Sequence, residues 1–103
     1  MAELVQAQRS GDTLHLNALV ARLDISCARD FKAQCESHWG EGIRQVVVDM
    51  AKVAYVDSTA IGAFLSLYRR LPQDGGSIRL LHAAPAVQTV VEVLRLHRIF
   101  LLG

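Results

Sequence analysis

VAYVDSTAIG, residues 53–62, begins as an apolar, strand-like run and passes directly into a helical pattern. Asp57, Ser58 and Thr59 stand at the junction, so a hydroxyl is expected at the start of a helix. The first turn of a helix has unpaired backbone N–H groups and a partial positive charge, and it therefore tolerates a phosphate well. Ser58 is accordingly a candidate phosphorylation site. The alternative is that Asp57 or Ser58 only caps the helix, which is common for both residue types.

Upstream of this stretch, the sequence predicts a hairpin, a helix and a central strand. Extended segments at 4–9 and 13–20 flank a Ser-Gly-Asp turn, which favours an antiparallel hairpin. A helical pattern follows from residue 25 to about residue 39, with Ser26 as a possible cap. Residues 43–50 contain three consecutive valines, which is typical of a central strand that is covered on both faces.

The helix expected over residues 59–71 has two distinct sides. Apolar residues recur at the spacing of one buried face, namely Ile61, Phe64, Leu65, Tyr68 and Leu71. Small residues gather on the opposite side, namely Thr59, Gly62, Ala63 and Ser66. This small-residue side begins beside Ser58 and leaves room for another protein to dock. Periodicity alone equally allows it to pack closely on a neighbouring element of the same chain.

The C-terminal third of the chain predicts one more strand and one more helix. Pro72 and the glycines at 75–76 end the preceding helix, and residues 77–82 form a strand. Pro85 suits the first turn of a last helix. The residues expected to face inward from this helix are Val87, Val90, Val91 and Leu94. The apolar tail, residues 99–102, is expected to pack back on the sheet.

Three parts of the sequence resemble the STAS domains of bacterial anti-sigma factor antagonists. Residues 57–62, DSTAIG, are similar to the family signature D-S-[ST]-[GA]-[LI]-G, and the family's phosphorylated serine falls on Ser58. Residues 21–24, ARLD, resemble the family's G-x-L-D, and residues 75–81 resemble its last turn and strand. Ala60 replaces the usual glycine and Arg22 replaces a common glutamate. Alanine is the better helix former by about 0.8–1 kcal/mol.

This resemblance implies an α/β fold: a single STAS-like domain over residues 1–103, with a mixed sheet of about four to five strands and about four helices. It also implies a partner-switching function. The unphosphorylated form would bind an anti-sigma factor serine kinase with a histidine-kinase-like ATPase fold, which would release a sigma factor or another target. Phosphorylation of Ser58 would prevent this binding, and a serine/threonine phosphatase would reverse it.

The resemblance and the helical pattern together assign a partner-binding site around Ser58. The expected members are Asp24, Asp57, Ser58, Thr59, Ile61, Gly62, Ala63 and Ser66. Thr59 is a second, weaker candidate for phosphorylation. Asp57 would cap the helix and position the hydroxyl. Asp24 matches the aspartate of G-x-L-D, although an aspartate at such a position is often only a turn former or a cap.

The composition indicates a globular protein of one domain. The chain has 103 residues, of which 51% are hydrophobic and 20% are charged, and its formal net charge is +1. The basic residues are scattered, which argues against binding to nucleic acid. Every apolar run is shorter than the roughly 20 residues that a membrane-spanning helix needs, and the N-terminus has no signal-peptide core. We therefore expect a cytoplasmic protein that does not insert in a membrane. The partner-switching interpretation adds the expectation of a monomer when free, which gains its stable interface from the kinase.

The cysteines and histidines do not predict a metal site, a cofactor or an enzyme. Cys27 and Cys35 fall in one expected helix, about 12 Å apart along its axis, which is too far for a disulfide. The four histidines have no ligand spacing relative to them. Two other functions remain open. One is a STAS subunit of a transport ATPase or signalling complex that binds without phosphorylation; the other, less supported, is a small thiol-dependent or nucleotide-using enzyme.

Overall fold

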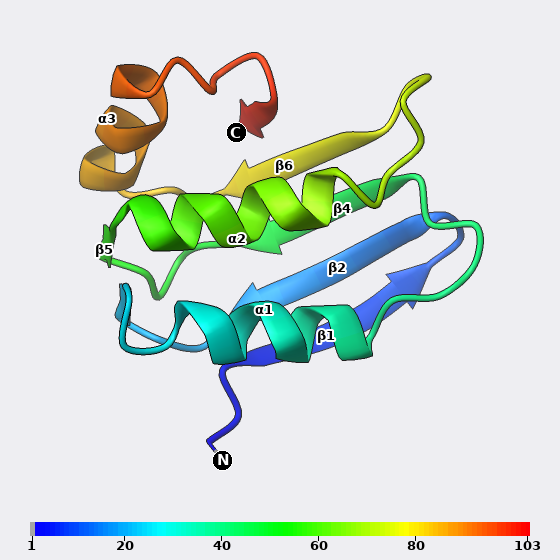
Figure 1. The fold of residues 1–103 in the computed structure, drawn as a ribbon, viewed down its shortest axis with the longest axis horizontal. Coiled ribbons are helices and arrows are strands. Elements are labelled where there is room, and N and C mark those ends of the chain that lie inside the picture. Colours follow the sequence, from blue (N-terminus) through cyan, green and yellow to red (C-terminus); the bar gives the residue numbers. More distant parts are fainter. Residues whose placement is uncertain (1) are drawn as a thin grey trace.

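The computed structural model describes residues 2–103 and is built around a five-stranded mixed sheet (Figure 1). Its strands lie in the order β1-β2-β4-β6-β7. They comprise β1 (Val5–Ser10), β2 (Thr13–Ala18), β4 (Gln45–Asp49), β6 (Ser77–Leu81) and β7 (Phe100–Leu102). The predicted hairpin is confirmed, because β1 and β2 pair antiparallel and Gly11 has a φ of +60° in the turn between them. The other neighbouring strands pair parallel.

A second sheet has two strands, each of which precedes one of the two longer helices in the sequence. It consists of β3 (Arg22–Leu23) and β5 (Tyr55–Val56), which pair parallel. β3 leads into helix α1 (Ala28–Ser37), and β5 leads directly into helix α2 (Ser58–Tyr68). Parallel pairing therefore places the beginnings of both helices at the same edge of the molecule.

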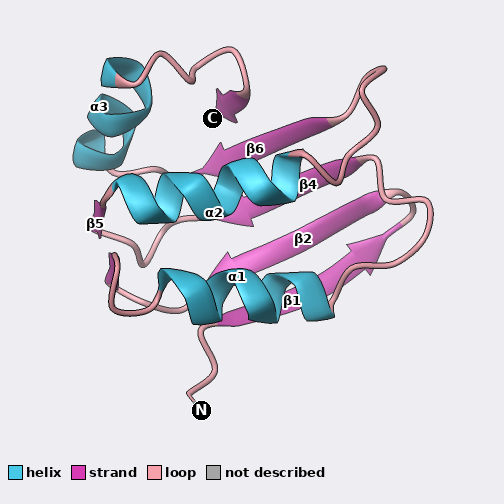
Figure 2. Cartoon of the chain, viewed as in Figure 1, coloured by secondary structure: helices cyan, strands magenta, loops and turns pink. Residues whose placement is uncertain are grey.

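Three helices are present among the described residues, whereas about four were expected. They are α1, α2 and α3 (Pro85–Val93), and the segments between the described elements form turns, bends and irregular loops. Figure 2 shows α1 and α2 side by side, covering one face of the sheet. The strand prediction for residues 43–50 was therefore wrong in one respect. Val46 and Val48 are buried, whereas Val47 is only half-buried, because no helix of residues 2–103 covers its side of the sheet.

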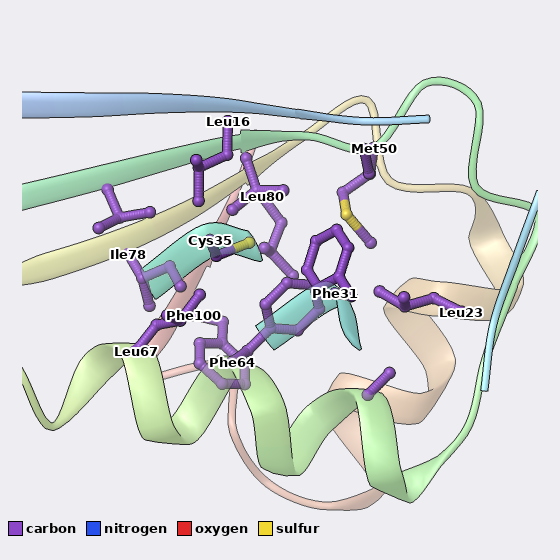
Figure 3. Packing of buried hydrophobic residues seen from close by; sticks show 14 of the residues in the cluster. Leu16, Leu23, Phe31, Cys35, Met50, Phe64, Leu67, Ile78, Leu80 and Phe100 are labelled. Atoms are coloured by element: carbon purple, nitrogen blue, oxygen red, sulfur yellow. The ribbon is translucent and has the colours of Figure 1, made fainter. Parts of the chain in front are cut away.

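The core lies between this covered face and the helices (Figure 3). Three phenylalanines from different elements meet edge to face at its centre. The ring centroids of Phe31 and Phe64 are 5.9 Å apart, and those of Phe64 and Phe100 are 6.0 Å apart. The prediction that the C-terminal tail packs on the sheet is confirmed, because Phe100 is fully buried in β7.

The buried face of α2 is rotated from the predicted one. Ile61 and Phe64 are buried as expected, but Leu65 and Tyr68 are only half-buried. Leu67, which the pattern did not select, is fully buried. The buried side also includes small residues, Ala60 and Ala63. Alanine side chains are small, so a helix that buries them can pack closely on its neighbours. Close packing of the helix therefore competes with burial of its largest side chains.

Two details of the other helices also differ from expectation. Ser26 does not cap α1, because the helix begins later, with Cys27 at the N-cap position and no side-chain cap. In α3, Val87 and Val91 are buried and Val90 is half-buried as expected, but Leu94 is exposed. The helix ends at Val93, so Leu94 no longer follows the helical spacing on which the prediction relied.

Candidate functional site

The carboxyl ends of β3 and β5 bring two aspartates to the same edge. Arg22 pairs with Tyr55 and Leu23 pairs with Val56, so the next residues along the two strands are Asp24 and Asp57. The backbone N–H of Asp57 also donates to the Leu23 carbonyl oxygen at 3.3 Å. Parallel strands present their carboxyl ends, where loops carry functional residues, at a common edge. The predicted site residues of the two motifs therefore lie at one place.

Asp57 is the N-cap of α2. Its Oδ1 accepts hydrogen bonds from the backbone N–H of Thr59 at 3.0 Å and from that of Ala60 at 3.2 Å. The Thr59 hydroxyl donates to the same oxygen. The bond from this hydroxyl, followed by the backbone N–H bonds, lowers the pKa of Asp57 below its ordinary value, because each of them favours the ionised carboxylate. Of the two cap assignments open from the sequence, the one to Asp57 is confirmed.

Ser58 is exposed and is the first residue of α2. Within residues 2–103, its hydroxyl takes part in no hydrogen bond, whereas the hydroxyl of Thr59 is engaged with Asp57 and Thr59 is half-buried. The cap is thus supplied by the neighbour, and the Ser58 hydroxyl faces solvent at the positive end of a helix dipole.

The Asp57 carboxylate also joins α2 to the loop before α1. Its second oxygen, Oδ2, accepts a hydrogen bond from the backbone N–H of Ile25 at 3.0 Å. One carboxylate therefore holds groups from two segments that are 32 residues apart in the sequence. This connection fixes the position of the loop relative to the exposed Ser58.

Asp24 organises the loop itself. Its Oδ1 accepts from the backbone N–H of Ser26 at 3.0 Å and from the Ser26 hydroxyl at 2.5 Å. These bonds, followed by the smaller contribution of Arg22, lower the pKa of Asp24 from its ordinary value. The Asp24 carbonyl oxygen accepts from the N–H of Cys27 and of Ala28 at the start of α1. Its structural role is therefore that of a turn former, at the rim where the resemblance had placed it.

The other predicted site residues divide by burial. Gly62 is exposed, and Thr59 and Ser66 are half-buried, with the Ser66 hydroxyl donating to the Gly62 carbonyl oxygen at 3.1 Å. Ile61 and Ala63 are buried, so their side chains support α2 from below and do not lie on its open side. The open side of the predicted docking helix thus consists of Ser58, Gly62 and part of the small-residue face.

Two exposed apolar residues at this edge were not predicted from the sequence. The side chain of Ile25 is 78% exposed, and that of Tyr55 is 42% exposed. The available signal was their position in the sequence: Ile25 directly follows the motif 21–24, and Tyr55 is separated from the motif 57–62 by one residue. The sequence does not predict that they are exposed, because isoleucine and tyrosine residues in short apolar runs usually lie in the core.

Metal-binding, thiol and membrane-spanning features bear on the other functions that the sequence left open. Within residues 2–103, no group of three or more His, Cys, Asp or Glu side chains is placed to hold a metal ion. Cys35 is buried, which raises the pKa of its thiol to about 12 and leaves it unreactive near neutral pH. In the same described part of the chain, no helix has both the length and the apolar character needed to cross a bilayer.

The matched family is the one that the sequence suggested. A family model described as "Mlab, STAS domain" matches residues 5–103. The chain therefore belongs to the STAS domain family, and the predicted α/β fold with a mixed sheet is confirmed.

Solved structures share this fold at low sequence identity. An anti-sigma-factor antagonist (STAS) domain protein from Planctomyces limnophilus matches with a TM-score of 0.84 at 16% identity, covering 96% of this chain and 87% of that one. The anti-sigma factor antagonist SpoIIAA in its unphosphorylated form matches with a TM-score of 0.77 at 19% identity, and the match covers 96% of this chain and 87% of that one. The phosphorylated form of SpoIIAA, from Bacillus, matches with a TM-score of 0.69 at 19% identity, and the match covers 96% of this chain and 90% of that one. At these identities the likeness establishes the fold.

Proposed function

We propose that this protein is an anti-sigma factor antagonist of a partner-switching pathway in the cytoplasm. In its unphosphorylated form it binds an anti-sigma factor serine kinase with a histidine-kinase-like ATPase fold, and that kinase then releases its sigma factor or another target. Phosphorylation of Ser58 by the kinase ends the binding, and a serine/threonine phosphatase restores it. The protein is a monomer when free, and Ser58 acts as a substrate and not as a catalyst.

The unengaged, exposed hydroxyl of Ser58 carries this proposal. A serine that capped the helix would have its hydroxyl occupied by backbone N–H groups, but Asp57 performs that role here. Thr59 is a poorer acceptor of phosphate, because its hydroxyl is bonded to Asp57. Further support comes from the fold, since SpoIIAA, which shares it, has been solved in a phosphorylated form.

The charges around Ser58 explain how phosphorylation would prevent docking. A phosphoserine carries a charge of about −1.5 to −2 at neutral pH. It would lie next to the Asp57 carboxylate, whose lowered pKa keeps it ionised. A group of anions buried in an interface must lose its hydration without a prearranged counter-charge, which weakens binding strongly. The fold itself should persist, because the positive end of the α2 dipole favours an anion at this position.

The proposal is tested by incubating the protein with ATP and each histidine-kinase-like ATPase of its own organism, followed by peptide mass spectrometry. We expect stoichiometric phosphate on Ser58 and none on Thr59. Ser58→Ala should remain folded and bind the kinase persistently, whereas Ser58→Asp should remain folded and bind about ten-fold or more weakly. Ser10→Asp, which changes an exposed serine at the last residue of β1, is the matched control and should bind like the wild type.

Phosphorylation at another residue, or equal binding by Ser58→Asp and wild type, would contradict the proposed switch. Unfolding of Ser58→Ala would instead indicate a structural role for the hydroxyl. Stable binding to an ATPase without any modification would favour the alternative function, a STAS subunit of a transport ATPase or signalling complex.

A further inference from the structure

Two exposed apolar residues, Ile25 and Tyr55, lie near the edge that carries Ser58. Single exposed apolar residues are ordinary on protein surfaces. These two, however, come from the paired strands β3 and β5 and their loop, and both are within three residues of the aspartates that meet at this edge. The most exposed large apolar side chain among the described residues, Ile25 at 78%, is thus positioned beside the candidate phosphorylation site.

Arg22 adds a cation to this surface. Its guanidinium carbon lies 4.5 Å from the centroid of the Tyr55 ring, and its Nε lies 3.4 Å from Asp24 Oδ2. The side chain of Arg22 is 67% exposed, whereas that of Asp24 is only 19% exposed. A partner approaching this surface therefore meets the positive charge of the pair first. Stacking on Tyr55 also limits the motion of the arginine before any partner arrives.

The position of Ile25 is fixed by the same residue that caps α2. The hydrogen bond from the Ile25 N–H to Asp57 Oδ2 is 3.0 Å long, and the turn that follows is held by Asp24 and Ser26. The side chain of Ile25, in contrast, is exposed. A side chain presented by a fixed backbone loses little entropy on binding, which is characteristic of interface anchors.

We propose that Ile25, Tyr55 and Arg22 form a partner-selection surface, which docks on the kinase that phosphorylates Ser58. The kinase would provide an apolar pocket for Ile25, bordered by a carboxylate that faces Arg22. This inference rests on the proposed function and adds the chemistry of the partner to it. A kinase whose border is basic at this point would be rejected, because like charges brought together in an interface are strongly unfavourable.

Binding of variants to that kinase, measured by isothermal titration calorimetry, tests the inference. Ile25→Ser should weaken binding about ten-fold or more, because the side chain becomes buried in the complex. Its matched control is Val93→Ser, which removes an apolar side chain of similar exposure, 72%, at the end of α3. Arg22→Glu should weaken binding by about five-fold or more, and Arg22→Gln by less. Arg98→Glu is the control for a change of charge.

Salt dependence provides a second readout for Arg22. Wild-type affinity should fall between about 50 and 300 mM salt, and the affinity of Arg22→Gln should fall less steeply. Circular dichroism of each variant verifies that it is folded. Equal affinities for Ile25→Ser, Arg22→Glu and their two controls would overturn the inference while leaving the proposed function intact. Failure of the wild type to bind any such kinase would overturn both.

Discussion

At the residue scale, neighbouring side chains at the start of α2 have separate roles. Asp57 accepts hydrogen bonds from Thr59, Ala60 and Ile25, whereas the adjacent Ser58 makes none among the described residues. A cap provided by Ser58 itself would conflict with phosphorylation, because the modification would remove the cap. With Asp57 as the cap, Ser58 can change its charge while the helix start remains in place.

The role of Asp57 predicts a pH dependence of stability. Its native hydrogen bonds lower its pKa below the ordinary value of 3.8, so the unfolded chain binds this proton more readily than the folded protein does. The stabilisation is therefore complete well above that value and is lost as the pH falls through the folded pKa. Asp57→Asn should flatten the decline in urea midpoint below about pH 5, and Asp57→Ala should cost about 1 kcal/mol at neutral pH.

Urea titrations monitored by circular dichroism between about pH 7 and 3 measure this effect. Asp24 and Asp49, which also have lowered pKa values, contribute the remaining decline in the same direction. Glu41→Gln, an exposed carboxylate without a side-chain hydrogen bond among the described residues, is the control. Parallel profiles for Asp57→Asn and the wild type would show that the Asp57 bonds do not stabilise the fold.

At the element scale, α3 ends in a motif that normally contains glycine. The N–H of Leu96 bonds to the Val91 carbonyl oxygen at 2.9 Å, and the N–H of Arg95 bonds to that of Glu92 at 2.9 Å. This is the Schellman pattern, in which the residue after the cap adopts a left-handed conformation. Arg95 occupies that position with a φ of +58°. A residue with a Cβ is strained there, whereas glycine is not.

Arg95→Gly should therefore stabilise the protein, by about 0.5–1 kcal/mol, despite the greater freedom of glycine in the unfolded chain. Urea denaturation of the variant and of Arg98→Gly measures the effect. Arg98 does not have a positive φ, so its replacement should be neutral or destabilising. If the two glycine variants had the same stability, strain at Arg95 would not be the cause.

At the scale of the whole molecule, Phe64 connects the parts that position the site. Its ring contacts Phe31 of α1 and Phe100 of β7, so a single side chain joins both long helices to the edge strand of the sheet. Phe64→Ala should lower the free energy of unfolding by about 3–5 kcal/mol. Because that loss is a large fraction of the stability of a small domain, Phe64→Leu, with a smaller loss, keeps the test measurable if the alanine variant is unfolded.

Chemical denaturation followed at both far-UV and near-UV wavelengths measures this effect. A single cooperative transition with a lower midpoint would agree with one shared core. A loss below about 1 kcal/mol for Phe64→Ala would show that the aromatic cluster is not central to the fold.

The sequence predicted most elements, but not which of their faces are buried. The hairpin, the strand before the motif, the helix that begins at Ser58 and the strand β6 are encoded by local patterns of turns and apolar residues, whereas β7 was expected only as a tail that packs on the sheet. The rotation of α2 was not predicted, because burial of Ala60 and Leu67 depends on how closely α1 and the sheet approach it. Periodicity describes one helix in isolation, whereas packing is shared among several elements.

The sequence by itself determined the family, the α/β fold and the position of Ser58 at a helix start, because short motifs and local apolar patterns carry each of these signals. Only the tertiary structure decided that Asp57 also holds Ile25, that Arg22 lies on Tyr55, and that the sheet is covered by helices on one face. The first two of these features arise from the parallel pairing of β3 with β5, which joins segments more than 30 residues apart. Contacts across such a distance depend on the whole core, and no local pattern contains them.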